Sequence, residues 1–152
     1  MRISELINKN SIIGNLNARD KKGAIDELAL SVSQTINTSA KDIANVLMER
    51  EQLGSTGIGG GIAIPHGKLD AVDSIVVGFG RSQEGVEYES LDNKPVHIFF
   101  LLLTSEKSTG GHLKVLAQIS KLLKMDHFKE GLLTADSVDD IYDIIMAQDE
   151  DF

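Results

Sequence analysis

The chain has 152 residues, of which 41% are hydrophobic, 25% charged and 5% aromatic, a composition typical of one globular domain. Lys and Arg total 15 against 23 for Asp and Glu, and the resulting formal charge of −8 argues against a broad nucleic-acid-binding face, which needs clustered cations. Because the chain has no cysteine, disulfides, cysteine–zinc sites, iron–sulfur clusters and thiolate catalysis are excluded.

Apolar residues at helical spacing predict three helices in the first third of the chain, with a short strand between the first and the second. The helices are predicted over Ile3–Ile7, Asp20–Thr35 and Ser39–Gln52, and the strand over Ser11–Leu16. The third helix begins with a pattern that resembles a capping box, because Ser39 is followed three residues later by Asp42.

The segment from residue 53 to residue 68 contains six glycines and is interpreted as a loop, and both strands and helices are predicted after it. The strands are predicted over Ser74–Arg81, Gly85–Tyr88 and Pro95–Leu103, and the helices over Gly111–Lys124, His127–Leu133 and Val138–Ala147. Helices before, strands in the middle and helices after predict an α/β or α+β fold whose sheet is covered on both faces. The pattern does not predict the strand order.

No stretch of the sequence has the apolar length of a membrane span or the pattern of a secretion signal. The longest apolar stretch, Val96 to Leu103, falls far short of the roughly 20 residues of a membrane span and contains His97. The opening residues, MRISELINKN, lack the apolar core of a signal peptide. We therefore expect a cytoplasmic protein without a membrane-inserted segment.

Residues 54–68 read GSTGIGGGIAIPHGK, and a segment this rich in glycine can present backbone N–H groups to an anion. It matches neither the P-loop, which needs a lysine after its second glycine, nor the G-x-G-x-x-G fingerprint of dinucleotide-binding proteins. We therefore expect no nucleotide cofactor. The candidate phosphoryl-binding donors in this segment are Ser55, Thr56, Gly59, Gly60 and Gly61.

His66, between Pro65 and Gly67, is the candidate nucleophile of this segment. With an ordinary pKa of about 6.5, imidazole is mostly neutral at cell pH. A neutral ring can attack a phosphoryl group with one nitrogen if the other keeps its proton and an acceptor fixes the tautomer. The fixed φ of Pro65 restrains the approach to the ring, and Gly67 is expected to leave open space beside it. The alternative interpretation is a turn histidine without chemistry.

His112 is the second candidate, because it follows Gly110 and Gly111 at the start of a predicted helix. Four apolar residues share its helical face: Val115, Leu116, Ile119 and Leu123. At the positive end of the helix, a neutral His112 would suit a nearby anion and donate N–H to a phosphoryl oxygen, unless it is only a satisfied helix-start residue. His97 is interpreted as a hydrogen-bonded structural residue and His127 as solvated. The four histidines show no zinc-ligand spacing.

Residues 48–68, MEREQLGSTGIGGGIAIPHGK, resemble the signature of the phosphotransferase-system enzyme IIA components of the fructose–mannitol type. The opening, RISELINKNSIIGNLNARDKKGAIDELA, is similar to the nitrogen-related (PtsN) branch, and the late GHLKVLAQISKLL is similar to the family's second-histidine helix. The resemblance covers nearly the whole chain. It implies one IIA type-2 domain over residues 1–152, with a small mixed β-sheet flanked by helices on both faces, and a phosphohistidine mechanism.

The resemblance also implies roles for single residues. It places His66 at the phosphorylated histidine, and His112 at a second histidine that lies close to the first and assists phosphoryl binding or transfer. It places Arg50 near the site, where its guanidinium could contact phosphate oxygens. The implied donor is a small HPr-like phosphohistidine carrier, and no metal or other cofactor is implied. The expected output is phosphorylation-dependent regulation through partner proteins.

Three alternatives stay open. The first is a IIA component that passes phosphate to a fructose- or mannitol-type IIB domain for sugar uptake. The second is a protein-binding module that is never phosphorylated. The third is a small-anion enzyme that uses His66 as general base.

Overall fold

The computed structural model describes residues 2–148, apart from the side chains of Ser108 and Thr109, and contains six α-helices and six strands within this part of the chain. The helices are α1 (Ile3–Leu6), α2 (Lys21–Ile36), α3 (Ala40–Gln52), α4 (Thr109–Leu123), α5 (Asp126–Thr134) and α6 (Val138–Ala147), with a 3₁₀ turn over Glu106–Ser108. The strands are β1 (Ile7–Ile13), β2 (Gly57–Gly59), β3 (Ile62–Ala63), β4 (His66–Lys68), β5 (Val76–Val86) and β6 (Val96–Thr104).

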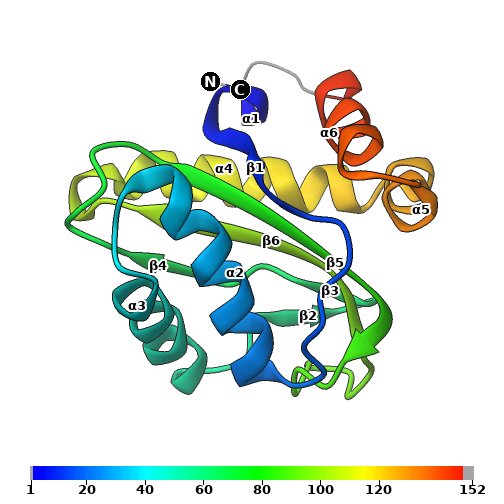
Figure 1. Cartoon of the computed structure of the whole chain (residues 1–152), viewed down its shortest axis with the longest axis horizontal. Helices are drawn as coiled ribbons and strands as arrows, with labels where there is room; N and C mark the ends of the chain where they lie inside the picture. Colours follow the sequence, from blue (N-terminus) through cyan, green and yellow to red (C-terminus); the bar gives the residue numbers. More distant parts are fainter. Residues whose placement is uncertain (1, 149–152) are drawn as a thin grey trace.

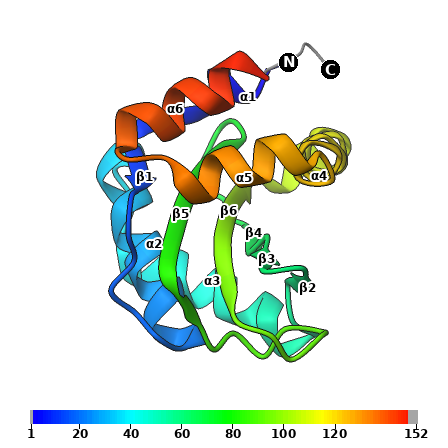
Figure 2. The same cartoon turned by 90° about the vertical axis from the view of Figure 1, so that its right-hand side faces the viewer.

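The strands form one open mixed sheet in the order β1-β5-β6-β3-β2, and β4 also pairs with β6 (Figure 1). β1 runs parallel to β5, and both β3 and β4 run parallel to β6. The β5–β6 and β2–β3 pairs are antiparallel. Helices α2 and α3 lie on one side of the sheet, and α4, α5 and α6 lie on the other (Figure 2). The predicted sheet with helices on both faces is confirmed.

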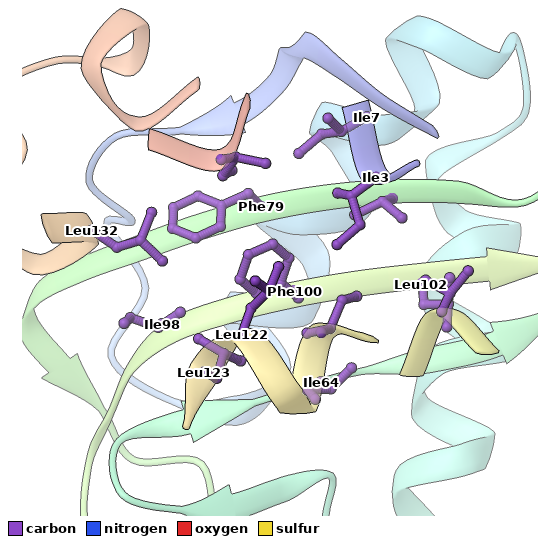
Figure 3. Close-up of a cluster of buried hydrophobic side chains, with 14 of the residues drawn as sticks. Ile3, Ile7, Ile64, Phe79, Ile98, Phe100, Leu102, Leu122, Leu123 and Leu132 are labelled. Carbon is purple, nitrogen blue, oxygen red and sulfur yellow. The ribbon is translucent and has the colours of Figure 1, made fainter. Parts of the chain in front are cut away.

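Each face of the sheet carries its own hydrophobic core, because side chains alternate along the central strand β6. Ile98, Phe100 and Leu102 belong to the core under α4, α5 and α6, whereas Phe99, Leu101 and Leu103 belong to the core under α2 and α3. Figure 3 shows the first core, in which Phe79 and Phe100 lie near Leu122 and Leu132. The centroids of the two phenyl rings are 5.0 Å apart at an interplanar angle of 77°. The sheet, which includes β4, is therefore packed against a hydrophobic core on each face.

Two strand predictions needed correction. β1 begins at Ile7 rather than Ser11, because the polar residues 8–10 are tolerated on an exposed edge strand. The two strands predicted over residues 74–81 and 85–88 form the single strand β5, whose pairing with β6 shifts between Arg81 and Val86. Gly85 has a φ of 95° within this irregularity, a conformation that favours glycine.

The glycine-rich segment, interpreted from the sequence as a loop, contains the three short strands β2, β3 and β4. Strands of two or three residues are too short to show an alternating pattern, so the sequence could not reveal them. His66 consequently opens a strand and does not lie in a loop. None of the helices within residues 2–148 has the length and hydrophobicity needed for a transmembrane span.

Candidate functional site

Strand pairing fixes the backbone of His66. β4 runs parallel to β6 with His66 opposite Leu102, and the N–H of Leu102 donates to the carbonyl oxygen of Pro65 at 2.9 Å. The preceding apolar residues Ile62 and Ile64 are buried in the core under α4. The histidine backbone is therefore held by the centre of the sheet, while its side chain stays half-buried.

A hydrogen bond to the backbone determines which ring nitrogen of His66 carries the proton. Its Nδ1 lies 2.8 Å from the carbonyl oxygen of Ile64. Since a carbonyl only accepts, Nδ1 carries the proton and Nε2 keeps the free lone pair. Burial lowers the pKa of His66 below its ordinary value, and the nearby Arg50 cation lowers it further, against the hydrogen bond to Ile64 and the Glu51 carboxylate, which raise it. The ring is therefore neutral at cell pH.

His112 lies beside His66, on the first turn of α4. The centroids of the two imidazole rings are 5.1 Å apart and their planes meet at 64°. The Nδ1 of His112 lies 3.4 Å from Oγ1 of the buried Thr104. Burial lowers the pKa of His112, and the neighbouring His66 and Lys68 lower it further, so this ring is also neutral. The structure brings together the two histidines that the sequence placed 46 positions apart.

Arg50, on the last turn of α3, lines two adjoining hollows together with His66. Its Nη1 donates to the carbonyl oxygen of Gly54 at 2.8 Å. The first hollow, of about 370 Å³, is lined by Val46, Glu49, Arg50, His66, Gly67, Lys68 and His112. The second, of about 230 Å³, is lined by Arg50, Ser55, Thr56, Ile58, Ile64, His66, Leu116 and Ser120. The Arg50 guanidinium and the His66 ring thus lie between a histidine-lined and a hydroxyl-lined space.

Ser55 lines the second hollow together with His66, and its hydroxyl donates to the Tyr88 carbonyl oxygen at 3.5 Å. Thr56 has a different role. The N–H of Thr56 donates to Glu51 at 3.1 Å, and its hydroxyl makes a short hydrogen bond to the same carboxylate. Both donors of Thr56 are therefore engaged inside the protein. Thr56 borders the hydroxyl-lined hollow without a free donor to offer a phosphoryl oxygen.

Gly59 ends β2, and Gly60 and Gly61 form the turn to β3. None of the three is among the residues that line either hollow. Their φ angles are 97°, 67° and 79°, so the turn itself requires glycine. The N–H of Gly60 donates to Asp92 at 3.0 Å, and the carbonyl of Gly61 accepts from the backbone of residues 97 and 98. Turn geometry explains the glycine run, and the structure does not place it against His66.

Lys68 and Ser120 border the hollows although the sequence analysis did not select them. Lys68 follows His66 by two positions on a strand, a spacing that places both side chains on the same side and that would have identified it. The prediction that His97 is a hydrogen-bonded structural residue is confirmed, since its Nδ1 lies 2.8 Å from the Ser82 carbonyl oxygen. His127 is exposed on α5, as predicted.

Gly67 does not leave the open space that the sequence analysis expected, because a β-carbon there would collide with Val46 of α3. We expect Gly67→Ala to lower the free energy of unfolding by about 1–3 kcal/mol through this overpacking, measured by urea unfolding. Gly110→Ala is the matched control, since nothing lies within 4 Å of the added methyl group on α4. An equally large loss in Gly110→Ala would contradict the close approach of β4 to α3.

The two pKa shifts predict a specific titration. We expect NMR titration to give a pKa below 6.5 for both His66 and His112. Because a cation disfavours imidazolium, Arg50→Gln should raise the pKa of His66. Lys94→Gln, which removes an exposed cation that neither hollow includes, serves as the control. If the pKa of His66 is unchanged or lower in Arg50→Gln, the Arg50 charge does not act on the His66 ring.

The fold brings two neutral imidazole rings together beside Arg50, and comparison with known proteins shows the family to which the chain belongs. Residues 5–148 match the family model described as "Phosphoenolpyruvate-dependent sugar phosphotransferase system, EIIA 2". The chain belongs to this family. The resemblance inferred from the sequence is thereby confirmed.

Relatives are found in both the nitrogen-regulatory and the sugar-specific branches. The chain is 38% identical over 151 residues to the fructose-specific EIIABC component of Bacillus subtilis; the match covers 99% of this chain but only 24% of that protein. It is 35% identical to the nitrogen regulatory protein of Bradyrhizobium diazoefficiens, with 95% of each chain covered. The crystal structure of nitrogen regulatory protein IIA-Ntr from Neisseria meningitidis superposes with a TM-score of 0.88 at 34% identity, covering 94% of this chain and 98% of that one.

Proposed function

We propose that the protein is a phosphocarrier that accepts a phosphoryl group on Nε2 of His66 from an HPr-like phosphohistidine carrier. The observation that supports this most is the hydrogen bond from Nδ1 of His66 to the Ile64 carbonyl. It directs the lone pair of a neutral ring to Nε2, while Arg50 and His112 line the same hollow. The cytoplasmic location expected from the sequence is part of this proposal.

In the proposed step, Nε2 of His66 attacks the phosphorus of the carrier's phosphohistidine in line with the departing nitrogen. One N–P bond forms as the other breaks, and the carrier's imidazole leaves with the electron pair. In this proposal, Arg50 and Lys68 line the hollow beside His66 and hold the phosphoryl oxygens, and the Ser55 hydroxyl turns to them from the Tyr88 carbonyl oxygen. If Thr104 donates to Nδ1 of His112, the Nε2–H of that ring is a further donor. Because the bond types match, the transfer is reversible.

We propose a regulatory output, in which the phosphoryl group changes which protein partners bind. Phosphorylation adds negative charge beside Arg50 and Lys68, so the two forms of the protein present different surfaces. The match over 95% of the length of a nitrogen regulatory protein supports this reading. The similarity to a fructose-specific EIIABC component supports a second candidate function, which is transfer of the phosphoryl group to a IIB domain.

The test is incubation with phosphoenolpyruvate, a phosphotransferase-system enzyme I and its HPr-like carrier. We expect one acid-labile, base-stable phosphoryl group per chain, assigned to His66 by mass spectrometry. No incorporation would favour the pure binding module. Transfer from the phosphorylated protein to a purified IIB domain and then to sugar would favour the transport role.

His112→Ala should slow phosphoryl acceptance while leaving His66 as the acceptor. The reason is that His112 contributes a donor beside the reacting ring but is not the nucleophile in this proposal. Removing one positioned hydrogen-bond donor from an oxygen that gains charge in the transition state typically slows a reaction by roughly 10²- to 10³-fold. Rapid-quench measurements in both directions would check the effect, and rates equal to wild type would remove the assigned role.

A further inference from the structure

Behind Arg50 lies a buried polar cluster, the Glu51 network, made of Lys21, Glu51, Thr56 and Tyr88. Only 2% of the Glu51 side chain and 13% of the Lys21 side chain are exposed. Lys21 begins α2 and Glu51 lies near the end of α3, two helices that pack side by side (Figure 1). The network therefore joins two helices to the glycine-rich segment.

Every oxygen of the Glu51 carboxylate has a donor. Oε1 accepts from the Thr56 N–H and pairs with Nζ of Lys21, both at 3.1 Å. Oε2 accepts from the Thr56 hydroxyl. The Thr56 hydroxyl has one proton, and it donates this proton to the carboxylate. The same hydroxyl therefore accepts a hydrogen bond from the Tyr88 O–H at 3.2 Å. Burial, and then the Glu51 charge, raise the pKa of Tyr88, so the phenol keeps its proton.

Two hydrogen bonds, one between backbone groups and one from the imidazole ring to a backbone carbonyl, continue this network to the reacting ring. The carbonyl oxygen of Thr56 accepts from the Ile64 N–H at 3.0 Å. The carbonyl of the same Ile64 accepts from Nδ1 of His66 at 2.8 Å. Thr56 therefore binds Glu51 on one side and, through Ile64, orients His66 on the other.

The network also encloses the turn that carries two other groups of the site. Arg50 directly precedes Glu51, and Ser55 directly precedes Thr56. Bonding between residues 51 and 56 closes this turn, whose Gly54 carbonyl accepts from Arg50. A buried ion pair adds little net stability compared with apolar side chains of similar size, so stability alone gives a weak reason for its presence here.

We propose that Glu51 and Thr56 are positioning residues of the phosphoryl-transfer site: they fix the Ile64 carbonyl that selects the His66 tautomer. The kinetic part of this inference rests on the proposed function. The tautomer itself is measured on the unphosphorylated protein and does not depend on it.

The decisive variant is Thr56→Val, which keeps the side-chain shape but removes the hydroxyl between Glu51 and Tyr88. We expect ¹⁵N NMR of the imidazole to show one Nδ1-protonated tautomer for His66 in wild type and a mixture in Thr56→Val. The kcat for phosphoryl acceptance should fall by roughly 10- to 100-fold, with an unchanged KM for the carrier. Thr56→Ser restores the hydroxyl and should restore both readouts.

Thr35→Val is the matched control. Its hydroxyl bonds Ser11 Oγ at 3.1 Å and the Val32 carbonyl oxygen at 2.9 Å, on the last turn of α2 at the other end from Lys21. Both Val variants should lose thermal stability, but only Thr56→Val should change the tautomer and kcat. Should Thr56→Val unfold, Tyr88→Phe removes one donor and keeps the Thr56–Glu51 bonds, with a smaller change in the same two readouts.

A single Nδ1-protonated tautomer in Thr56→Val would overturn the positioning role, whatever the kinetics show. Equal losses of kcat in Thr56→Val and Thr35→Val would also overturn it, because they would indicate a general loss of stability. Failure of wild type to accept phosphoryl would instead contradict the proposed function while leaving the tautomer result to decide the inference.

Discussion

His66→Ala is expected to abolish phosphoryl incorporation while leaving the fold intact. The side chain is only half-buried and donates a hydrogen bond to the Ile64 carbonyl, so little packing is lost. The backbone at this position is held by pairing with β6, which alanine preserves. Intact-mass spectrometry after incubation with the phosphorylated carrier measures the loss, and circular dichroism checks the fold.

The control is His127→Ala, which removes an exposed histidine on α5 and should phosphorylate as wild type does. His112 lies 5.1 Å from His66 between ring centroids, so it is the neighbour most able to accept misdirected phosphoryl. Incorporation that persists in His66→Ala and disappears when His112 is also replaced would move the acceptor to the second ring. That result would contradict the assignment of His66 as nucleophile.

The predictable parts of the fold were those with long periodic patterns. The long helices, α2, α3 and α4, show an apolar stripe at helical spacing, and β6 shows an apolar run, because each packs one or two long faces into a core. The helix expected from Gly111 begins two residues earlier, at Thr109. β2, β3 and β4 escaped prediction because their formation depends on pairing with β6 and with one another, not on their own sequence.

The candidate site was predictable where chemistry is local and unpredictable where it depends on distant contacts. Pro65, His66 and Gly67 stand out in the sequence, but Gly67 proved to be a packing position against Val46. Periodicity cannot bring His112 to His66; the resemblance implied that proximity, and the structure shows it. Glu51 looks like any charged residue near a helix end, and its burial is explained by its pairing with a lysine 30 positions away and by two hydrogen bonds from Thr56.

Arg81→Met is expected to lower the free energy of unfolding by about 3–5 kcal/mol, a large share of the roughly 5–15 kcal/mol of a typical domain. Arg81 is 4% exposed on β5. Its Nε donates to the Gly14 carbonyl oxygen at 2.8 Å, and its Nη1 donates to the carbonyl oxygens of Leu132, at 3.0 Å, and Ala135. Methionine fills a similar space without donors and leaves these three acceptors unpaired.

Two of those carbonyls lie at the end of α5. The last carbonyl groups of a helix have no backbone N–H partner within the helix. Arg81 therefore completes the C-terminus of α5 and ties the connection after β1 to the sheet. Arg19→Met is the control, since its ion pair with Glu84 is exposed and is worth less than about 1 kcal/mol. Urea unfolding midpoints compare the two variants. Equal losses would mean that water satisfies the α5 carbonyls as well as Arg81 does.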